Sequence, residues 1–205
     1  MTLALPDGIT LYFARHGQTQ ANVEKRFSGF KDTPLTPLGL NQAASVGHIL
    51  KRELGVAEGF AFVASPLTRA VTTMRIARET MGLAPDGFTT DNRLKEINLG
   101  IWDQLTDEEA RALSPVLFDA RAADKWHVRV PGGENYAEVA ARLTDWVHEL
   151  KQNTVAVSHG AAIRILRGLL AGLDWQAMSA LDEPQGVVFV AKGRAAGSDV
   201  VRLDP

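Results

Sequence analysis

Two histidines in this sequence follow apolar segments and precede a glycine. His16 stands in the tripeptide RHG (15–17) after the run ITLYFA, and His159 stands in SHG (158–160) at the end of TVAVS. A third polar cluster, SPLTR, follows the run FAFVA and ends at Arg69. Forked guanidinium groups donate paired hydrogen bonds to phosphate oxygens, and a neutral imidazole can attack phosphorus. The three clusters therefore predict phosphoryl chemistry, provided that the fold brings them together.

The segments around these clusters have the pattern of alternating strands and helices. Apolar runs that suit strands covered on both faces occupy residues 9–14, 60–65 and 154–158. Helical spacing of apolar residues occurs at 38–52, 67–81 and 136–150. This alternation predicts an α/β fold with a mostly parallel sheet and helices on both faces. Ligands bind such sheets beyond the carboxyl ends of the strands, which is where all three polar clusters fall.

The C-terminal segment has a different pattern. The runs GVVFVA (186–191) and DVVRL (199–203), separated by a glycine-containing turn, predict a hairpin at the edge of the sheet. Such an edge can be covered by a second copy, which would make a homodimer, or blunted in a monomer.

We expect residues 1–205 to form a single domain, because no linker, repeat or low-complexity tract interrupts them. The least regular region, about 98–131, is our candidate for a substrate cap. Insertions between sheet elements are where binding specificity often resides.

The composition of the chain excludes several kinds of site and partner. The 205-residue chain has no cysteine, which excludes disulfides, thiolate nucleophiles and cysteine-ligated metals. No other metal cluster is evident, so we expect neither a metal nor a cofactor. A net charge of -2 provides no basic field for phosphate backbones, and we therefore expect no nucleic-acid partner.

The N-terminal segment MTLALPDGITLYF has no positively charged leader, and no apolar run reaches roughly 18 residues. We expect a cytoplasmic protein that enters no membrane and whose partner is a small-molecule phosphomonoester.

The chemistry of the side chains suggests a role for each. One ring nitrogen of His16 can attack phosphorus while the other donates to a carbonyl. Arg15, Arg69 and His159 can compensate the charge on the phosphoryl oxygens. The leaving alkoxide needs a proton, which a carboxylic acid at the pocket edge can give before it deprotonates water. Glu96, in the segment NRLKEINLG, is our candidate for that acid.

The glycines after the two histidines suggest additional donors. Gly17 and Gly160 would let backbone amides approach an anion closely. A helix beginning near Gly160 would point its first N–H groups at the same anion.

At this point the sequence resembles a known family, the histidine phosphatase superfamily, also called phosphoglycerate mutase-like. The resemblance rests on ARHGQTQAN (14–22), RFSGFKDTPLTPLGLNQA (26–43), SPLTRAVTT (65–73), Glu96 with Gly100 and Trp102, PGGENYAEV (131–139) and SHG (158–160). These motifs cover most of the chain, and the resemblance implies a phosphoglycerate mutase-like fold.

The resemblance also implies roles for individual residues. His16 corresponds to the phosphorylated histidine, and Glu96 to the proton donor. The phosphate pocket corresponds to Arg15, Arg69 and His159, with Asn22 as a further donor. Ser28 and Gly29 match the loop that closes over the phosphate in the family.

The family contains both phosphatases and cofactor-dependent phosphoglycerate mutases. In the mutases, a tyrosine, a lysine and two arginines follow the acid residue, whereas this chain has Leu99 and then the acidic stretch DQLTDEEA (103–110). Negative charge there would repel a bisphosphorylated intermediate. Basic residues at positions 111, 121, 125 and 129 could restore a basic rim. We expect a phosphatase, with the mutase as the alternative.

A third alternative is a non-catalytic phosphate-binding module with a regulatory role. Such proteins usually lack the nucleophile, an arginine or the second histidine, all of which are present here.

Overall fold

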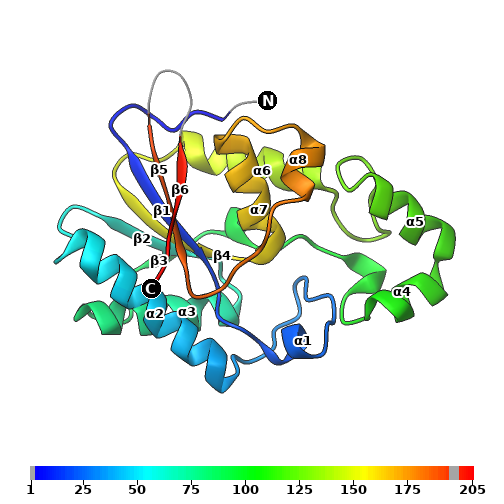
Figure 1. Cartoon of the computed structure of the whole chain (residues 1–205), viewed down its shortest axis with the longest axis horizontal. Coiled ribbons are helices and arrows are strands. Elements are labelled where there is room, and N and C mark those ends of the chain that lie inside the picture. Colours follow the sequence, from blue (N-terminus) through cyan, green and yellow to red (C-terminus); the bar gives the residue numbers. More distant parts are fainter. Residues whose placement is uncertain (1–2, 194–198) are drawn as a thin grey trace.

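A computed structural model describes residues 3–193 and 199–205 of the chain (Figure 1). The described residues contain a six-stranded sheet in the order β3-β2-β4-β1-β5-β6. Its strands are β1 (Thr10–Arg15), β2 (Ala61–Ala64), β3 (Thr89–Thr90), β4 (Thr154–Ser158), β5 (Val188–Lys192) and β6 (Val200–Leu203). β1 and β4 pair in parallel, as do β4 with β2 and β2 with β3, whereas β5 and β6 are antiparallel. The predicted α/β fold with a C-terminal edge hairpin is therefore confirmed, and the turn of that hairpin lies outside the described residues.

The helices of the fold alternate with the parallel strands. They are α1 (Gln20–Val23), α2 (Pro37–Leu54), α3 (Thr68–Met81), α4 (Asp107–Leu113), α5 (Pro115–Ala123), α6 (Tyr136–His148), α7 (Gly160–Leu170) and α8 (Trp175–Ser179). Single 3-10 turns occur at Asn92–Leu94 and Gly100–Trp102. In the part of the chain that the structure describes, no helix is both long and apolar enough to cross a membrane.

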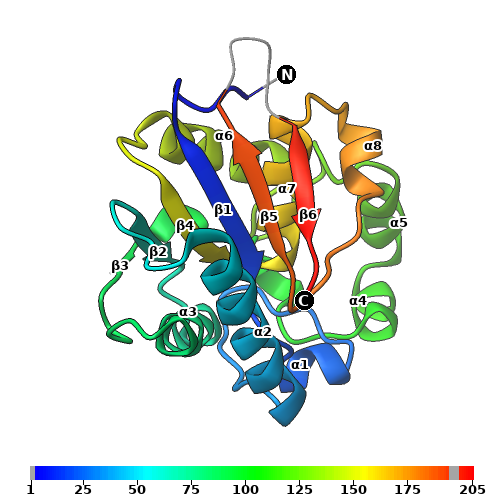
Figure 2. The same ribbon diagram turned by 60° about the vertical axis from the view of Figure 1, so that its left-hand side comes forward.

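β1 is apolar throughout because both faces of the sheet are covered. Leu11 and Phe13 pack in the cluster that includes residues of α6 and α7, whereas Tyr12 and Ala14 pack in the cluster that includes residues of α2 and α3. Successive side chains of a strand point to opposite faces, which assigns alternate residues to the two cores. Figure 2 shows α2 and α3 on one side of the sheet and α6 and α7 on the other.

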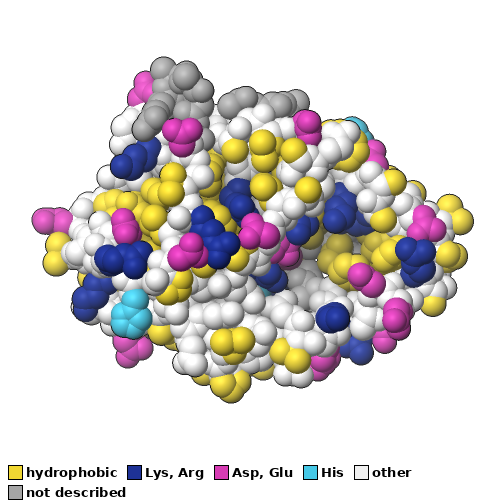
Figure 3. Space-filling model, in the orientation of Figure 1, with side chains coloured by type: hydrophobic (Ala, Val, Ile, Leu, Met, Phe, Trp, Pro, Cys, Tyr) yellow, Lys and Arg dark blue, Asp and Glu magenta, His cyan; other side chains and the backbone are white. Residues whose placement is uncertain are grey.

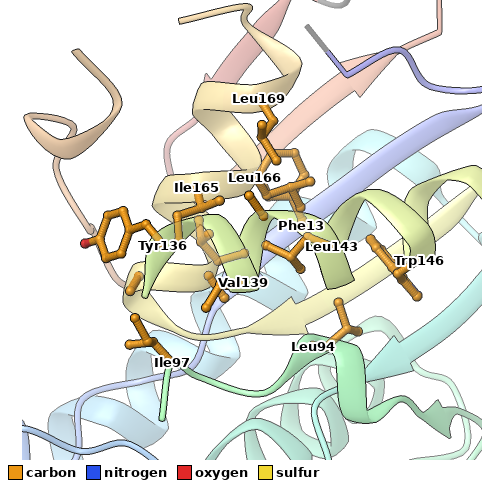
Figure 4. Packing of buried hydrophobic residues seen from close by; sticks show 14 of the residues in the cluster. Phe13, Leu94, Ile97, Tyr136, Val139, Leu143, Trp146, Ile165, Leu166 and Leu169 are labelled. Carbon is orange, nitrogen blue, oxygen red and sulfur yellow. The ribbon is translucent and has the colours of Figure 1, made fainter. Parts of the chain in front are cut away.

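The larger core fixes the position of α7, which begins directly after His159. Figure 4 shows Phe13 of β1 among Leu143 of α6 and Leu166 of α7. All three side chains are at most 1% exposed. Removing one such side chain from a packed core costs about 2–5 kcal/mol. This packing ties the histidine at the start of α7 to the sheet.

The register of the central strands brings the two histidine clusters together. Arg15 is opposite Ser158 at the ends of β1 and β4, and His16 donates its backbone N–H to the Ser158 carbonyl at 2.9 Å. α4 and α5 lie to one side of the sheet, beyond these strand ends (Figures 1 and 2). The sheet and these two helices are therefore the elements that enclose the site.

Candidate active site

A cavity of about 730 Å³ opens beyond the carboxyl end of β1 and beside the start of α7. Figure 3 shows the hollow between the body of the molecule and the α4–α5 region, with basic and hydrophobic side chains around it. Five predicted site residues line the cavity, namely Arg15, His16, Asn22, Ser28 and Glu96. Four others, Gly29, Arg69, His159 and Gly160, are not part of its lining.

His16 is buried and held by one hydrogen bond in the orientation that a nucleophile needs. Its Nδ1 lies 2.7 Å from the Gly17 carbonyl oxygen, which can only accept, so Nδ1 carries the proton and donates. Burial, with the cations of Arg15 and Arg69 nearby, holds the pKa of His16 well below its usual range. The neutral ring therefore leaves the lone pair of Nε2 available for attack on phosphorus.

His159 is fully buried next to His16, and the ring centroids are 5.1 Å apart. Its Nδ1 accepts a hydrogen bond from Arg69 Nε at 3.1 Å, and its Nε2 lies 2.7 Å from the Ser65 hydroxyl. Because Arg69 can only donate, the neutral ring carries its proton on Nε2. Burial, with Arg69 and then His16 nearby, holds the pKa of His159 well below its usual range. The second histidine is thus a neutral group fixed between two elements.

Glu96 is buried against the start of α7. Its Oε1 accepts from the backbone N–H groups of Ile97 at 2.9 Å and Ala162 at 3.2 Å, and its Oε2 accepts from that of Ala161 at 3.2 Å. Burial, and then the negative charge of Glu183, raises the pKa of Glu96. The N–H of Ile97 and the two arginines of the site oppose this shift. A raised pKa keeps the carboxyl protonated to higher pH, which is the direction that the predicted acid role requires.

The two predicted phosphate-binding arginines have different surroundings. Arg15 lines the cavity, and its Nη1 donates to the Glu183 carbonyl oxygen at 2.6 Å, while its buried Nε has no hydrogen-bond partner among the described residues. Arg69 is buried away from the cavity. Its guanidinium donates to His159 and to the loop of residues 28–32 at the Ser28, Gly29 and Lys31 carbonyl oxygens and the Asp32 carboxylate. In this conformation Arg69 holds the loop of residues 28–32, and Arg15 is the one of these two arginines that lines the cavity.

Asn22, Ser28 and Gly29 differ in whether they reach the cavity. Asn22 lines the cavity and uses its Oδ1 to accept from the backbone N–H of Thr19, which it caps, and from Gln185 Nε2. Ser28 also lines the cavity, whereas the Gly29 amide donates to the Asp103 carboxylate at 2.8 Å. Asn22 is thus held partly by Gln185, which also lines the cavity, whereas Gly29 is held by Asp103, which does not.

The glycines after the histidines serve packing as well as the site. A Cβ on Gly17 would lie 2.1 Å from the Gly39 carbonyl oxygen, and the Gly17 amide donates to the Thr73 hydroxyl. The first α7 amides after Gly160 donate to Glu96, as described above. The expectation that these amides would face the anion therefore differs from the structure, because side chains already satisfy them.

The acidic stretch after Glu96 contributes little charge to the cavity. Asp103 accepts from the backbone amides of Gly29 and Lys31, and Glu109 pairs with Arg26. Asp107 is the acidic residue of this stretch that lines the cavity. The predicted repulsion of a second anionic group is therefore weaker than the sequence suggests.

Arg121 and Lys125 form a basic wall on the α5 side of the cavity. Arg121 is buried, donates to the Val128 carbonyl oxygen at 2.8 Å, and its guanidinium carbon lies 6.0 Å from the Tyr136 ring centroid. Burial, and then the cation of Arg164, lowers the pKa of Lys125. Neither Arg121 nor Lys125 forms an ion pair with any residue that the structure describes. The sequence predicted a basic rim of four residues, of which Arg121 and Lys125 line the cavity. The other two do not, because Arg111 pairs with Asp119 and Arg129 pairs with Glu138.

The cavity side chains that sequence reasoning missed include Tyr136, Arg164, Glu183 and Gln185. Gln185 Nε2 donates to the His16 carbonyl oxygen at 3.1 Å, directly beside the predicted nucleophile. The predicted C-terminal hairpin could have indicated that Glu183 and Gln185 lie near the site. Its first strand, β5, is antiparallel to β1. The residues that precede β5 therefore lie beside the carboxyl end of β1.

Among residues 3–193 and 199–205, no cluster of three or more histidine, aspartate or glutamate side chains could hold a metal ion. The polar groups that line the cavity at the strand ends include an arginine, a neutral imidazole and a buried carboxyl. On an α/β sheet, this combination at the strand ends defines a site for handling phosphoryl groups.

The chain belongs to the histidine phosphatase superfamily (branch 1), whose pattern it matches over residues 11–204. The probable phosphoglycerate mutase GpmB of Salmonella paratyphi B is 34% identical over 179 residues, which are 80% of this chain and 76% of that protein. The 6-phosphofructo-2-kinase/fructose-2,6-bisphosphatase of Caenorhabditis elegans is 35% identical over 159 residues, or 76% of this chain.

The chain spans less than half of its fructose-2,6-bisphosphatase relatives, 32% of the Caenorhabditis elegans protein and 41% of one from Saccharomyces cerevisiae. A solved structure of a mycobacterial glucosyl-3-phosphoglycerate phosphatase with VO3 is similar over 95% of this chain and 97% of its own, with a TM-score of 0.75 and 29% identity. The predicted family is confirmed, and its relatives include both phosphatases and a probable mutase.

Proposed function

We propose that the protein is a metal-independent phosphomonoester hydrolase that acts through a phosphohistidine intermediate on a small phosphorylated metabolite. The observation that supports this most directly is the state of His16. Its Nδ1–H donates to the Gly17 carbonyl and its pKa is held low, so Nε2 is an unprotonated nucleophile at the cavity wall.

In the first step, His16 Nε2 attacks phosphorus, the bond from phosphorus to the ester oxygen breaks, and the leaving alkoxide takes the proton of Glu96. Arg15 compensates charge on the phosphoryl oxygens, because its guanidinium faces the cavity. The fixed positions of these side chains lower the cost of bringing them into the reacting geometry.

In the second step, water attacks phosphorus on the opposite side of the phosphorus–nitrogen bond. The Glu96 carboxylate takes a proton from that water, the bond to His16 breaks, and inorganic phosphate leaves. Glu96 returns to its protonated form, which burial favours. The cycle is balanced with water as its only second substrate.

The α5 side of the cavity supports a substrate that carries a second anionic group. Arg121 and Lys125 are cationic, partly or wholly removed from water, and without an ion-pair partner among the described residues. Cations in such surroundings gain from a bound carboxylate or phosphate. We therefore assign the choice of substrate to the segment of about 98–131, which supplies this wall and the cavity-lining aromatics Trp102 and Phe118.

The same wall favours a phosphoglycerate mutase as the second candidate. A mutase must keep a bisphosphorylated intermediate bound while it reorients, and Arg121 with Lys125 could hold its second phosphate. Asp107 on the cavity wall opposes such retention. We place hydrolysis first because Asp107 lines the same cavity and its negative charge acts on Lys125, where it partly offsets the lowering of the pKa by burial.

The test is phosphate release from a broad panel of phosphomonoesters, including phosphoglycerates, with chelator present. We expect release by the wild-type protein and a loss of at least about 10⁴-fold in His16→Ala, which lacks the nucleophile. Persistent activity in this variant would overturn the nucleophile assignment. Interconversion of phosphoglycerates without net release would establish the mutase, and phosphate binding without turnover would indicate a regulatory module.

A further inference from the structure

Glu183 places a negative charge beside the arginine that faces the cavity. It lies between α8 and β5 and lines the cavity. Its Oε2 is 3.6 Å from Arg15 Nη1 and its Oε1 is 3.0 Å from Arg164 Nη2. Its backbone carbonyl oxygen also accepts from Arg15 Nη1 at 2.6 Å. The Glu183 carboxylate thus lies within ion-pair distance of the guanidinium that an anionic ligand would use.

Glu183 is also adjacent to the buried acid. A Cβ on Gly160 would lie 2.5 Å from Glu183 Oε2, and the next residue, Ala161, donates its amide to Glu96 Oε2 at 3.2 Å. The carboxyl groups of Glu96 and Glu183 therefore flank the first residues of α7. The negative charge of Glu183 is the second-largest cause, after burial, of the raised pKa of Glu96.

We propose that Glu183 is a positioning residue that holds Arg15 in the free protein, competes with bound phosphate for it, and supports the acid function of Glu96. The proposal rests on the proposed function. When a phosphoryl group binds Arg15, two anions share one guanidinium, and their repulsion weakens retention of the phosphate product. Arg164 keeps Glu183 in place, because its Nη2 pairs with the other carboxylate oxygen and its Nε donates to the Leu181 carbonyl oxygen.

Charged groups on several elements face these two carboxyls and contribute to any pH dependence. Those that act on Glu96 or on Glu183 are Arg15 of β1, Arg69 of α3, Lys125 next to α5, Tyr136 of α6 and Arg164 of α7. All of them are kept in the variants of Glu183, so a change in behaviour reports on the removed carboxylate.

The first measurement is the affinity for inorganic phosphate, by calorimetric titration of the metal-free protein. Glu183→Gln keeps an acceptor for Arg164 and removes the charge, so we expect its Kd for phosphate to fall by about tenfold. Glu183→Asp keeps the charge and should bind phosphate within about threefold of the wild-type Kd. Glu58→Gln removes the charge of an exposed glutamate outside the cavity and should change nothing. An unchanged or higher Kd in Glu183→Gln would overturn the proposal.

The second measurement is the pH profile of kcat with an alkyl phosphate. Removing the negative charge of Glu183 should lower the pKa of Glu96, so the alkaline limb of the profile should move to lower pH in Glu183→Gln. A merely structural role would lower kcat at all pH values without moving this limb. A limb in the same position as that of the wild-type protein would also overturn the proposal.

The controls separate this proposal from the proposed function. A wild-type protein that neither binds phosphate nor hydrolyses any ester would refute the proposed function. A wild-type protein that does both, with Glu183→Gln unchanged, would refute the role of Glu183 alone. If Glu183→Gln is insoluble, Glu183→Ala makes the same test, because it also removes the charge from a side chain that is 25% exposed.

Discussion

The cavity has two walls that differ in how firmly their polar side chains are fixed. On the wall formed by the strand ends, His16 is buried with a hydrogen-bond partner on its ring, and His159, buried directly behind it, has partners on both ring nitrogens. On the α5 wall, the Arg121 side chain has one hydrogen bond and the Lys125 side chain has none among the described residues. The strand-end wall is ready for chemistry before a ligand arrives, whereas the α5 wall has cations that a ligand can satisfy. This difference suggests that the first wall sets the reaction and the second selects the substrate.

Replacement of the buried acid is expected to give the largest difference between substrates on the strand-end wall. Glu96→Gln cannot deliver the proton that an alkoxide needs, so kcat should fall by about 10²- to 10³-fold with alkyl phosphates. Nitrophenyl phosphate, whose leaving group needs no proton, should lose far less. The measurement is kcat for both substrates in the variant and in the wild-type protein.

Glu134→Gln is the matched control for this prediction. Glu134 also accepts a backbone amide, that of Asn98, and pairs with Arg142, but it does not line the cavity. The control should reduce both rates equally, if at all. Equal losses on both substrates in Glu96→Gln would remove Glu96 from the acid role.

The buried histidines should make stability depend on pH. Their pKa values in the folded protein lie below the unfolded value of about 6.5, so at lower pH the unfolded chain binds protons that the folded protein does not. Their contribution to the free energy of unfolding is complete above that pH. It is lost as the pH falls, by up to about 1.4 kcal/mol per pH unit for each histidine.

The test compares the pH slope of the free energy of unfolding between variants, from urea titrations between about pH 7 and about pH 5.5. Averaged over this range, His16→Asn should have a slope smaller by roughly 0.8 kcal/mol per pH unit than the wild-type protein, because a histidine with an unfolded pKa of about 6.5 is only partly protonated in the unfolded chain there. His48→Asn, on the exposed face of α2, should keep the wild-type slope. Glu96, whose pKa is raised, stabilises at low pH and loses that contribution as the pH rises, but it is common to all three proteins. Equal slopes in all three would contradict a neutral, buried His16.

The strands and most helices could be predicted because their signals are local. The apolar run at 154–158 coincides with β4, and the helical spacing at 67–81 differs from α3 by one residue at its start. The carboxyl ends of these strands then located His16 and His159 without further information. Periodicity was sufficient to place both histidines at strand ends, and the structure adds that these strands are parallel neighbours.

The partners of individual side chains could not be predicted in this way. Arg69 donates to carbonyl oxygens of Ser28 and Gly29, about 40 residues earlier in the chain. Any loop has carbonyl groups, so its sequence does not show which of them will accept. The contact of Glu183 with Arg15 could likewise not be predicted, because the two residues are brought together by the antiparallel pairing of β5 with β1. Sequence therefore predicted the location of the site and its histidines, and long-range pairing determined which arginine faces the ligand.

The smallest expected effect tests the α5 wall. Lys125→Met removes a cation from the cavity while keeping an aliphatic side chain, so kcat/KM should fall by about tenfold for phosphomonoesters that carry a carboxylate or a second phosphate. With nitrophenyl phosphate, which has no second anionic group, the change should be within about twofold. Lys151→Met removes an exposed lysine outside the cavity and should leave both substrates unaffected. Because the Lys125 ammonium forms no ion pair or hydrogen bond with the described residues, the variant leaves no buried carboxylate unpaired. Equal losses on the two kinds of substrate would mean that the α5 wall does not distinguish them, and that the strand-end wall selects the substrate as well as the reaction.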